Sequence, residues 1–352
     1  MIKDELEKEL TSIRIINDDR DYWFVRTFGG EIFEEFIVNN HVGLGFNDVP
    51  EKYITPCSDD ENYEAKKELR EYIGNHSSLE KGTLTKWTNQ VILFHHSIKT
   101  GDLVVIPSKD SRYISIGEII TDNVSIYEHG SSFVFKSEYH NYPNRVRKVK
   151  WLKHHPKRFF QGDLRNLLSS QQGITNANKY ANKIESGISS MFIRENQMRL
   201  VINIKQDEDI NAYALSRFLD SLIYFHKELC DELGIENNED LFIKIKLQSR
   251  GKTVLKSFAY LGIVGLLGLL SLSEDAGFKL KINEKTGEYE LNSTSGKGFL
   301  NTFSNFLDKK QERKIKYLEF IDAREKLKIE SPTDSIKSLE KSQFIPKKKL
   351  EK

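Results

Sequence analysis

Hydrophobic and polar positions change their period several times along the chain, and each change marks a predicted element. In residues 101–120, two apolar runs flank a polar turn, which is the pattern of a β-hairpin. Residues 31–40 carry apolar side chains at helical spacing, and residues 62–75 read as a helix that stops at a glycine. The longest amphipathic pattern spans residues 209–234, between a capping Asp and a terminal Gly. The sequence therefore predicts an α+β fold.

Length and the order of these patterns predict two folded domains. The chain has 352 residues, of which 38% are hydrophobic and 30% charged, so it can bury a sizeable core. An N-terminal helix and connector (residues 1–20) is expected before a first domain over residues 21–190. A second α+β domain is expected over residues 191–330, followed by a mobile lysine-rich tail over residues 331–352.

The net charge of +1 hides a segregation of charge along the chain. Residues 1–63 carry roughly 15 acidic and 6 basic side chains, whereas residues 136–194 carry roughly 12 basic and 3 acidic ones. Aromatic residues are interleaved with this basic block. One interpretation is a solvated face that balances the acidic segment. The other is a phosphate-facing patch, because aromatic rings beside cations suit base stacking and phosphate contacts.

Short segments follow one another in a defined order through residues 21–190. They are YWFVR (22–26) with a glycine pair after it, VGLGF (42–46), GDLV (101–104), IGEI (116–119) and RKVKWL (147–152). This order resembles the EVE-like branch of the PUA-like β-barrels, over about half of the chain. The resemblance implies an N-terminal PUA-like (EVE-like) β-barrel with flanking helices and an aromatic-lined pocket for a flipped, often modified, base. It also implies a setting in bacterial modification-dependent restriction and anti-phage defence.

The resemblance implies two groups of functional residues. A core position is the competing interpretation for every pocket aromatic. The resemblance implies a Trp after Gly43 and Gly45, where this chain has Phe46. Phe46 keeps a stacking surface but lacks the indole N–H donor. The base-pocket candidates are Trp23, Phe46, Asn47, Trp87 and Tyr113. The phosphate-binding candidates are Lys109 and Arg112 in the turn, and Arg145, Arg147, Lys148 and Lys150, which strand alternation divides between two faces.

Motifs for catalysis, metals or cofactors are incomplete. The Gly-Lys-Thr at residues 251–253 follows a predicted strand, but a P-loop also needs a glycine five residues before its Gly-Lys pair, where Lys246 stands. The histidine pairs at 95–96 and 154–155 have no cysteine or carboxylate cluster to frame a zinc ion. Two widely spaced cysteines and no evident secretory signal fit a reducing cytoplasm. The sequence therefore predicts a cytoplasmic protein with no cofactor, no metal and no recognised catalytic motif.

Together these features predict a nucleic-acid-binding protein of anti-phage defence, with DNA as the expected nucleic acid. The second domain is expected to serve assembly, as a homo-oligomer or with a defence-system partner protein, or effector action. The alternative is a membrane-acting or oligomerising effector whose barrel senses a nucleotide or a partner protein. It depends on the apolar run Phe258–Leu272, which has 15 residues where a membrane span needs about 20, so a buried helix competes with it. A degenerate or unrecognised nuclease is the third interpretation.

Overall fold

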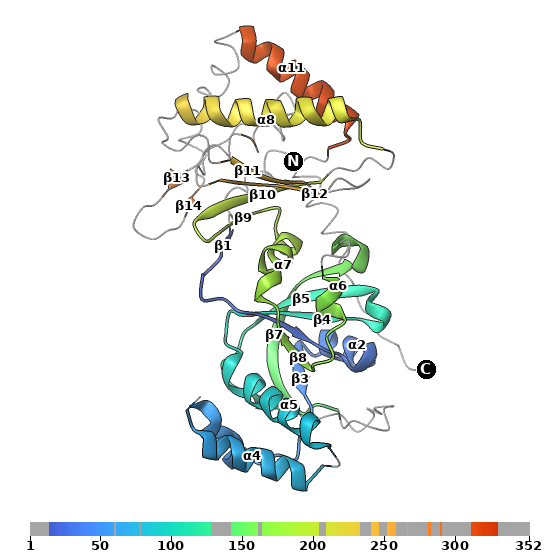
Figure 1. Cartoon of the computed structure of the whole chain (residues 1–352), viewed down its shortest axis with the longest axis vertical. Helices are drawn as coiled ribbons and strands as arrows, with labels where there is room; N and C mark the ends of the chain where they lie inside the picture. The colour runs from blue at the N-terminus through green and yellow to red at the C-terminus, as the bar shows by residue number, and fades with distance from the viewer. Residues whose placement is uncertain are drawn as a thin grey trace. The chain divides into compact units, whose positions relative to one another are not determined.

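The computed structural model describes residues 14–59, 61–77, 79–127, 142–160, 164–203, 209–232, 241–245, 252–257, 266, 281–282, 289–290 and 311–329. These residues divide into two compact units. The first unit is formed by residues 19–188, and the second by the described residues before 19 and after 188. Both units mix strands with helices (Figure 1), which confirms the expected α+β class.

A seven-stranded sheet curls into a half-barrel at the centre of the first unit (Figure 1). Its strands are β2 (Tyr22–Val25), β3 (His41–Leu44), β4 (Leu103–Pro107), β5 (Tyr113–Ile119), β6 (Ser125–Ile126), β7 (Arg145–Pro156) and β8 (Ile174–Asn176). They follow the order β3-β7-β5-β4-β2-β8, with β6 on β7, and only β2 and β4 among these pairs run parallel. The long β7 pairs with β3 at its start and with β5 further on, and a register shift beside Gly117 bends this ladder. The hairpin predicted over residues 101–120 is confirmed as β4 and β5.

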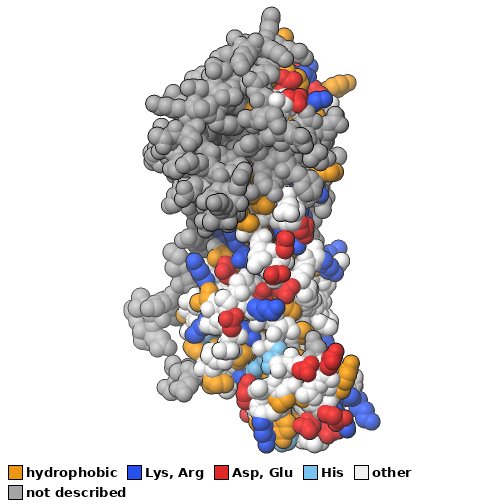
Figure 2. Space-filling model, turned by 90° about the vertical axis from the view of Figure 1, so that its left-hand side faces the viewer, with side chains coloured by type: hydrophobic (Ala, Val, Ile, Leu, Met, Phe, Trp, Pro, Cys, Tyr) orange, Lys and Arg blue, Asp and Glu red, His pale blue; other side chains and the backbone are white. Residues whose placement is uncertain are grey.

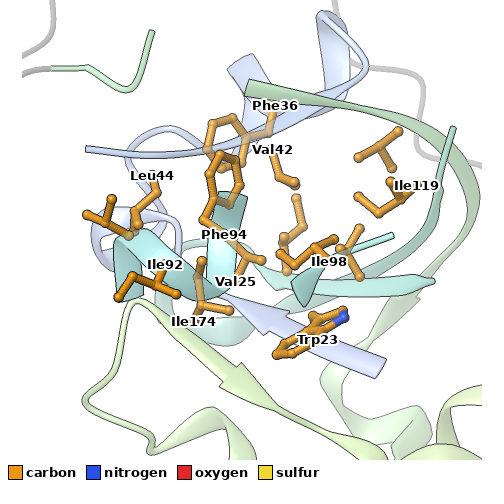
Figure 3. Packing of buried hydrophobic residues seen from close by; sticks show 14 of the residues in the cluster. Trp23, Val25, Phe36, Val42, Leu44, Ile92, Phe94, Ile98, Ile119 and Ile174 are labelled. Carbon is orange, nitrogen blue, oxygen red and sulfur yellow. The ribbon is translucent and has the colours of Figure 1, made fainter. Parts of the chain in front are cut away.

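The central strands of this sheet are buried on both faces, which explains their continuous apolar runs. Side chains alternate along β2, so that Tyr22 and Phe24 enter one hydrophobic cluster while Trp23 and Val25 enter the other. Figure 3 shows Trp23 and Val25 in this second cluster, packed among side chains from the neighbouring strands and helices. The sheet therefore separates two hydrophobic cores, and alternate residues along a strand contribute to opposite cores.

Helices and short turns cover the sheet. Asn62 caps the longest helix of this unit, because its side-chain oxygen accepts a hydrogen bond from the Ala65 amide at 3.1 Å. The helices are α2 (Phe33–Val38), α3 (Glu51–Ile54), α4 (Tyr63–Asn75), α5 (Lys81–Ile92), α6 (Arg165–Leu168) and α7 (Ala181–Ile188). The predicted helices over residues 31–40 and 62–75 are confirmed as α2 and α4. The short turns are η1 (Phe28–Gly30), η2 (Thr55–Ser58), η3 (Leu93–Ser97), η4 (Lys109–Ser111), η5 (Lys157–Phe160) and η6 (Asn178–Tyr180).

The second unit packs two helices against a five-stranded sheet. Its strands are β1 (Arg14–Ile15), β9 (Met191–Arg194), β10 (Gln197–Asn203), β11 (Leu241–Ile245) and β12 (Lys252–Ser257), in the order β1-β9-β10-β12-β11, and its helices are α8 (Ala212–Glu232) and α11 (Gln311–Lys326). Phe218 of α8 stacks on Phe320 of α11 at 5.5 Å, above Leu200 of β10. A separate pair joins β13 (Lys281–Ile282) and β14 (Tyr289–Glu290). The long helix predicted over residues 209–234 corresponds to α8.

Three predictions from the sequence fall mainly outside the described residues: the N-terminal helix, the apolar run Phe258–Leu272 and the lysine-rich tail. Of the expected N-terminal segment, Arg14 and Ile15 form strand β1 beside β9 in the second unit. Of the apolar run, Leu266 is buried in the core of the second unit. Among the helices that the structure describes, none is both long and apolar enough to cross a membrane.

Candidate functional site

A pocket of about 320 Å³ opens in the first unit beside α5 and η1. This volume lies at the lower end of the range for small-ligand sites, about 300–1,000 Å³. Its walls combine aromatic rings, one cation, one carboxylate, an amide and exposed backbone. The side chains and backbone that give it this chemistry are Arg26, Phe28, Glu31, Trp87, Gln171 and Gly173.

Trp87 forms one wall of the pocket from helix α5. Its half-buried indole packs against Phe46, with 5.2 Å between the ring centroids. Gly173 lies against the same indole, and a Cβ atom there would come within 3.2 Å of the Trp87 ring. Glycine at this position therefore lets the backbone approach the ring closely, so that the wall is formed by an aromatic face and a main chain.

The backbone segment beside Trp87 is held by neighbours on α5. The buried amide of Gln90 donates to the Ile174 carbonyl at 2.9 Å and accepts from the Ile174 N–H, so this side chain replaces a strand partner at the edge of β8. Lys86 donates from Nζ to the Gln171 carbonyl at 2.9 Å. Because residues 86, 87 and 90 lie on one face of the helix, α5 both supplies the indole and holds the opposite rim.

Arg26 connects the two sides of the rim. Its backbone N–H donates to the Gly173 carbonyl at 2.8 Å, and its Nη1 donates to the side-chain oxygen of Gln171 at 3.3 Å. The guanidinium is thus held at the rim by an exposed amide, which a ligand atom could replace.

Two strained turns, η1 and η4, meet at the edge of the pocket. Phe28, Gly29 and Gly30 all have positive φ angles, of 51°, 70° and 97°, and Asp110 and Ser111 follow the same left-handed geometry at 57° and 52°. Left-handed backbone at a residue other than glycine costs of the order of 1 kcal/mol or more and persists only where the surrounding structure imposes it. The two turns therefore hold each other in a defined conformation.

The basic turn of the sequence is fixed beside the pocket by this contact. A Cβ atom on Gly30 would lie 2.1 Å from the Lys109 backbone nitrogen, and Gly29, one residue earlier, lines the pocket. Lys109 and Arg112 are both exposed, and Arg112 approaches Asp110 at 3.7 Å in a solvent-screened pair. The predicted basic turn and the aromatic pocket are thus neighbours in the fold.

Only some of the five base-pocket candidates lie at the pocket. Trp87 lines the pocket and Phe46 supports it from behind. Trp23 is only 4% exposed, and its Nε1 donates to the Asp102 carboxylate at 2.9 Å, so it is a core residue of the half-barrel. Burial raises the pKa of that carboxyl, although Trp23 and two backbone N–H groups donate to it.

Asn47 and Tyr113 lie away from the pocket lining. The Asn47 side chain is engaged by the main chain on both sides, donating to the Tyr142 carbonyl at 2.7 Å and accepting from the Asn144 N–H at 3.0 Å. Tyr113 is 44% exposed at the start of β5. Arg26, Phe28 and Gln171 line the pocket without having been singled out from the sequence, where only the position of Phe28 beside a glycine pair signals an unusual backbone.

Arg147, a predicted phosphate-binding residue, instead binds main-chain carbonyls inside the protein. Its side chain is fully buried, and its guanidinium donates to the carbonyls of Phe94 at 2.8 Å, His95 at 2.8 Å, Asp122 at 2.7 Å and Thr121 at 3.2 Å. Burial lowers the pKa of Arg147 to about 10. This side chain joins the η3 turn to the segment after β5 and cannot reach a phosphate in solvent.

Arg145 is also engaged inside the protein. It pairs with Glu51 at 2.6 Å and donates to the Val49 carbonyl at 2.5 Å. Lys148 and Lys150 point to the other side of β7, as strand alternation predicts, and Lys150 is exposed. Figure 2 shows Lys and Arg side chains interspersed with Asp and Glu over the described part of the face it displays. Lys109, Arg112, Lys148 and Lys150 therefore remain phosphate candidates. The buried Arg145 and Arg147 do not.

His95 makes the stability of the first unit dependent on pH. Its side chain is 5% exposed, 3.7 Å from Glu51, and burial lowers the pKa of His95 to about 4. Because the unfolded chain binds a proton near pH 6.5, the unfolded state carries more protons between about pH 6.5 and 4. The free energy of unfolding is therefore expected to fall as the pH drops through this window.

The check is the midpoint of urea unfolding measured between pH 7 and pH 4 in wild type and His95→Phe. The variant keeps a ring and removes the titration, so its midpoint should change less across the window. His76→Phe, which replaces an exposed histidine, is the matched control. An unchanged pH dependence in His95→Phe would contradict the assignment.

Groups that could act as nucleophiles or metal ligands are buried or scattered. Ser115 lies 2.7 Å from His154 Nδ1, but its side chain is fully buried between β5 and β7, where no substrate can reach it. Cys57 and Cys230 are buried free thiols, and burial raises the pKa of Cys230 to about 11. In the part of the chain that the structure describes, no group of three His, Cys, Asp or Glu side chains could hold a metal ion. The pocket itself offers aromatic rings, donors and acceptors, which suit binding by stacking and hydrogen bonds.

Comparison with known proteins points to the first unit. The model of a family described as a domain of unknown function (DUF8426) matches residues 25–178. No curated protein and no solved structure matches the chain. The residues that line the pocket, from Arg26 to Gly173, all lie within the matched segment, so the chain is similar to this family over the region that forms the candidate site.

Proposed function

We propose that the first unit is a nucleic-acid-binding module that takes one base into the pocket beside Trp87. The observation that carries the proposal is the pocket itself: a half-buried indole, a Phe28 ring and the Arg26 guanidinium converge on one hollow of about 320 Å³. Aromatic faces bind bases by stacking, and an arginine at the rim can pair with a base edge or a phosphate. The curled half-barrel supports its assignment as a PUA-like barrel of the EVE-like branch.

The phosphates next to the inserted base would lie on the η4 turn. Lys109 and Arg112 are exposed there, and the contact between Gly30 and Lys109 fixes the turn at the pocket edge. Lys150 on β7 extends the set of exposed cations. A few such contacts give a moderate dependence of affinity on salt, because each neutralised phosphate releases counterions.

DNA with a modified base is the proposed target, in a cytoplasmic anti-phage role, by the resemblance of the segments of the first unit to EVE-like modules. In this proposal the second unit serves assembly or effector action. The competing function, an effector that senses a free nucleotide, uses the same pocket. The two differ in the ligand, since a strand adds phosphate contacts that a mononucleotide lacks.

Replacing Trp87 by alanine is expected to weaken nucleic-acid binding about fivefold to a hundredfold, because stacking of a base on an aromatic side chain contributes about 1–3 kcal/mol. Fluorescence anisotropy of labelled single strands and duplexes, unmodified and cytosine-modified, at two salt concentrations measures this. Tyr63→Ala, which removes an exposed ring from α4 outside the pocket, is the matched control.

The same titrations decide between the two functions. Binding of strands that weakens with salt and with Trp87→Ala, but not with Tyr63→Ala, supports the base-binding module. Competition by mononucleotides as strong as by strands would favour the nucleotide sensor. Equal affinity of wild type and Trp87→Ala for every strand would refute the proposal.

A further inference from the structure

The three tryptophans of the chain differ in what their indole N–H groups bind. Trp23 donates from Nε1 to the Asp102 carboxylate at 2.9 Å, and Trp151 donates to the Phe36 carbonyl at 3.2 Å. Trp87 has no acceptor for its Nε1–H anywhere in the described part of the chain. The fold thus supplies acceptors for the N–H groups of Trp23 and Trp151, whereas the N–H of Trp87 can donate to a ligand.

The unbonded N–H belongs to the tryptophan that forms the pocket wall. When an indole is buried, its N–H group usually has a hydrogen-bond acceptor, because burial without one is unfavourable. Trp87 is half-buried, with Phe46 and Gly173 packed against its ring. These contacts fix the ring plane and therefore also the direction of its Nε1–H.

We infer that Trp87 determines specificity by donating a hydrogen bond from Nε1 to an acceptor atom on the edge of the base that enters the pocket. The acceptor is a carbonyl oxygen or a ring nitrogen. This inference rests on the proposed function, because it concerns the same pocket. It adds that the indole recognises the hydrogen-bonding edge of a base in addition to supplying an apolar surface.

The other polar groups of the pocket fit such an edge. Arg26 supplies donors at the rim, where Gln171 holds it, and the exposed Glu31 carboxylate supplies an acceptor for an N–H of the base. Bases carry both acceptors and donors around one planar ring. An apolar ring of the same shape would offer no hydrogen-bond partner to Arg26, Trp87 or Glu31, which disfavours its binding relative to a base.

The test uses short single strands of DNA that carry one base among abasic residues. The base is compared with its apolar isostere, difluorotoluene for thymine and methylindole for adenine, in wild type and in Trp87→Phe. Wild type is expected to bind the isostere more weakly than the base, and the hydrogen bond from Trp87 Nε1 should account for roughly threefold to tenfold of this difference. Trp87→Phe keeps a ring but no N–H, so the difference should shrink by that factor.

Tyr63→Phe, which removes an exposed aromatic hydroxyl outside the pocket, is the control and should discriminate as wild type does. Free mononucleotides measured in competition show whether a strand is needed to present the base. If Trp87→Phe does not fold in a thermal melt, the same comparison is made with 1-methyltryptophan at position 87, which keeps the indole and removes only the N–H donor. Equal affinity of wild type for base and isostere would overturn the inference.

Failure of this inference and of the proposed function give different results. If Trp87→Phe discriminates base from isostere as strongly as wild type, the hydrogen bond from Nε1 is refuted while the base pocket stands. If neither strands nor mononucleotides bind wild type, both are refuted.

Discussion

Replacing Arg147 by methionine is expected to lower the free energy of unfolding by about 3–5 kcal/mol. The side chain is fully buried, and its guanidinium is the donor for four main-chain carbonyls in two segments that are distant in sequence. Methionine fills a similar length but donates nothing, so buried carbonyls would lose their partners, at about 1–3 kcal/mol for each one that water cannot reach.

Urea unfolding of wild type, Arg147→Met and Lys150→Met measures this. Lys150 lies on the same strand but is exposed, so its replacement should change the free energy of unfolding by no more than about 0.5 kcal/mol. Arg147→Lys should recover little, because an ammonium group cannot span the carbonyls that the planar guanidinium reaches. A stable Arg147→Met protein that binds nucleic acid poorly would restore the phosphate-binding interpretation of this residue.

Replacing Gly30 by alanine is expected to cost about 3–4 kcal/mol and to loosen the basic turn. Two effects add: the φ angle of 97° is unfavourable for any residue with a Cβ, and that Cβ would lie 2.1 Å from the Lys109 nitrogen. Because the obstacle is backbone and not the end of a flexible side chain, η4 itself would have to move. Affinity for nucleic acid should fall with stability if this turn carries the adjacent phosphate.

Gly29→Ala is the matched control for the clash. Its φ angle of 70° is also left-handed, but a Cβ there would meet nothing within 4 Å, so only the backbone strain of about 1–2 kcal/mol applies. Thermal and urea unfolding of the two variants separate strain from clash. If both variants lose the same stability, the contact between η1 and η4 is not the constraint that positions the basic turn.

Local patterns in the sequence determined the elements and the class of the fold. The apolar runs of residues 101–120 specify β4 and β5, and the run in β4 is continuous because both faces of this strand are buried. The helical period and the Asn62 cap specify α4 in the same way. These predictions depend on neighbours within a few residues, whose geometry the chain itself fixes.

The resemblance of ordered segments also led to Trp87 as a pocket candidate, but not to the residues that position it. Its position as pocket wall depends on Gly173, which lies far along the chain and approaches the indole only because Gln90 pairs with the edge of β8. Arg26 and Gln171 meet at the rim for the same reason. No local pattern carries information about such pairs, since they arise when α5 docks beside β2 and β8.

For the basic residues of β7, the sequence indicates their positions along the strand but not their exposure to solvent. Alternation along β7 correctly separates Arg145 and Arg147 from Lys148 and Lys150, but the sequence does not say which face is covered. Only the tertiary structure brings the η3 turn and the segment after β5 over the arginine face, where their carbonyls need donors. The sequence by itself determined where cations lie along the strand, whereas the structure decided which of them face solvent, because burial depends on what packs above the strand.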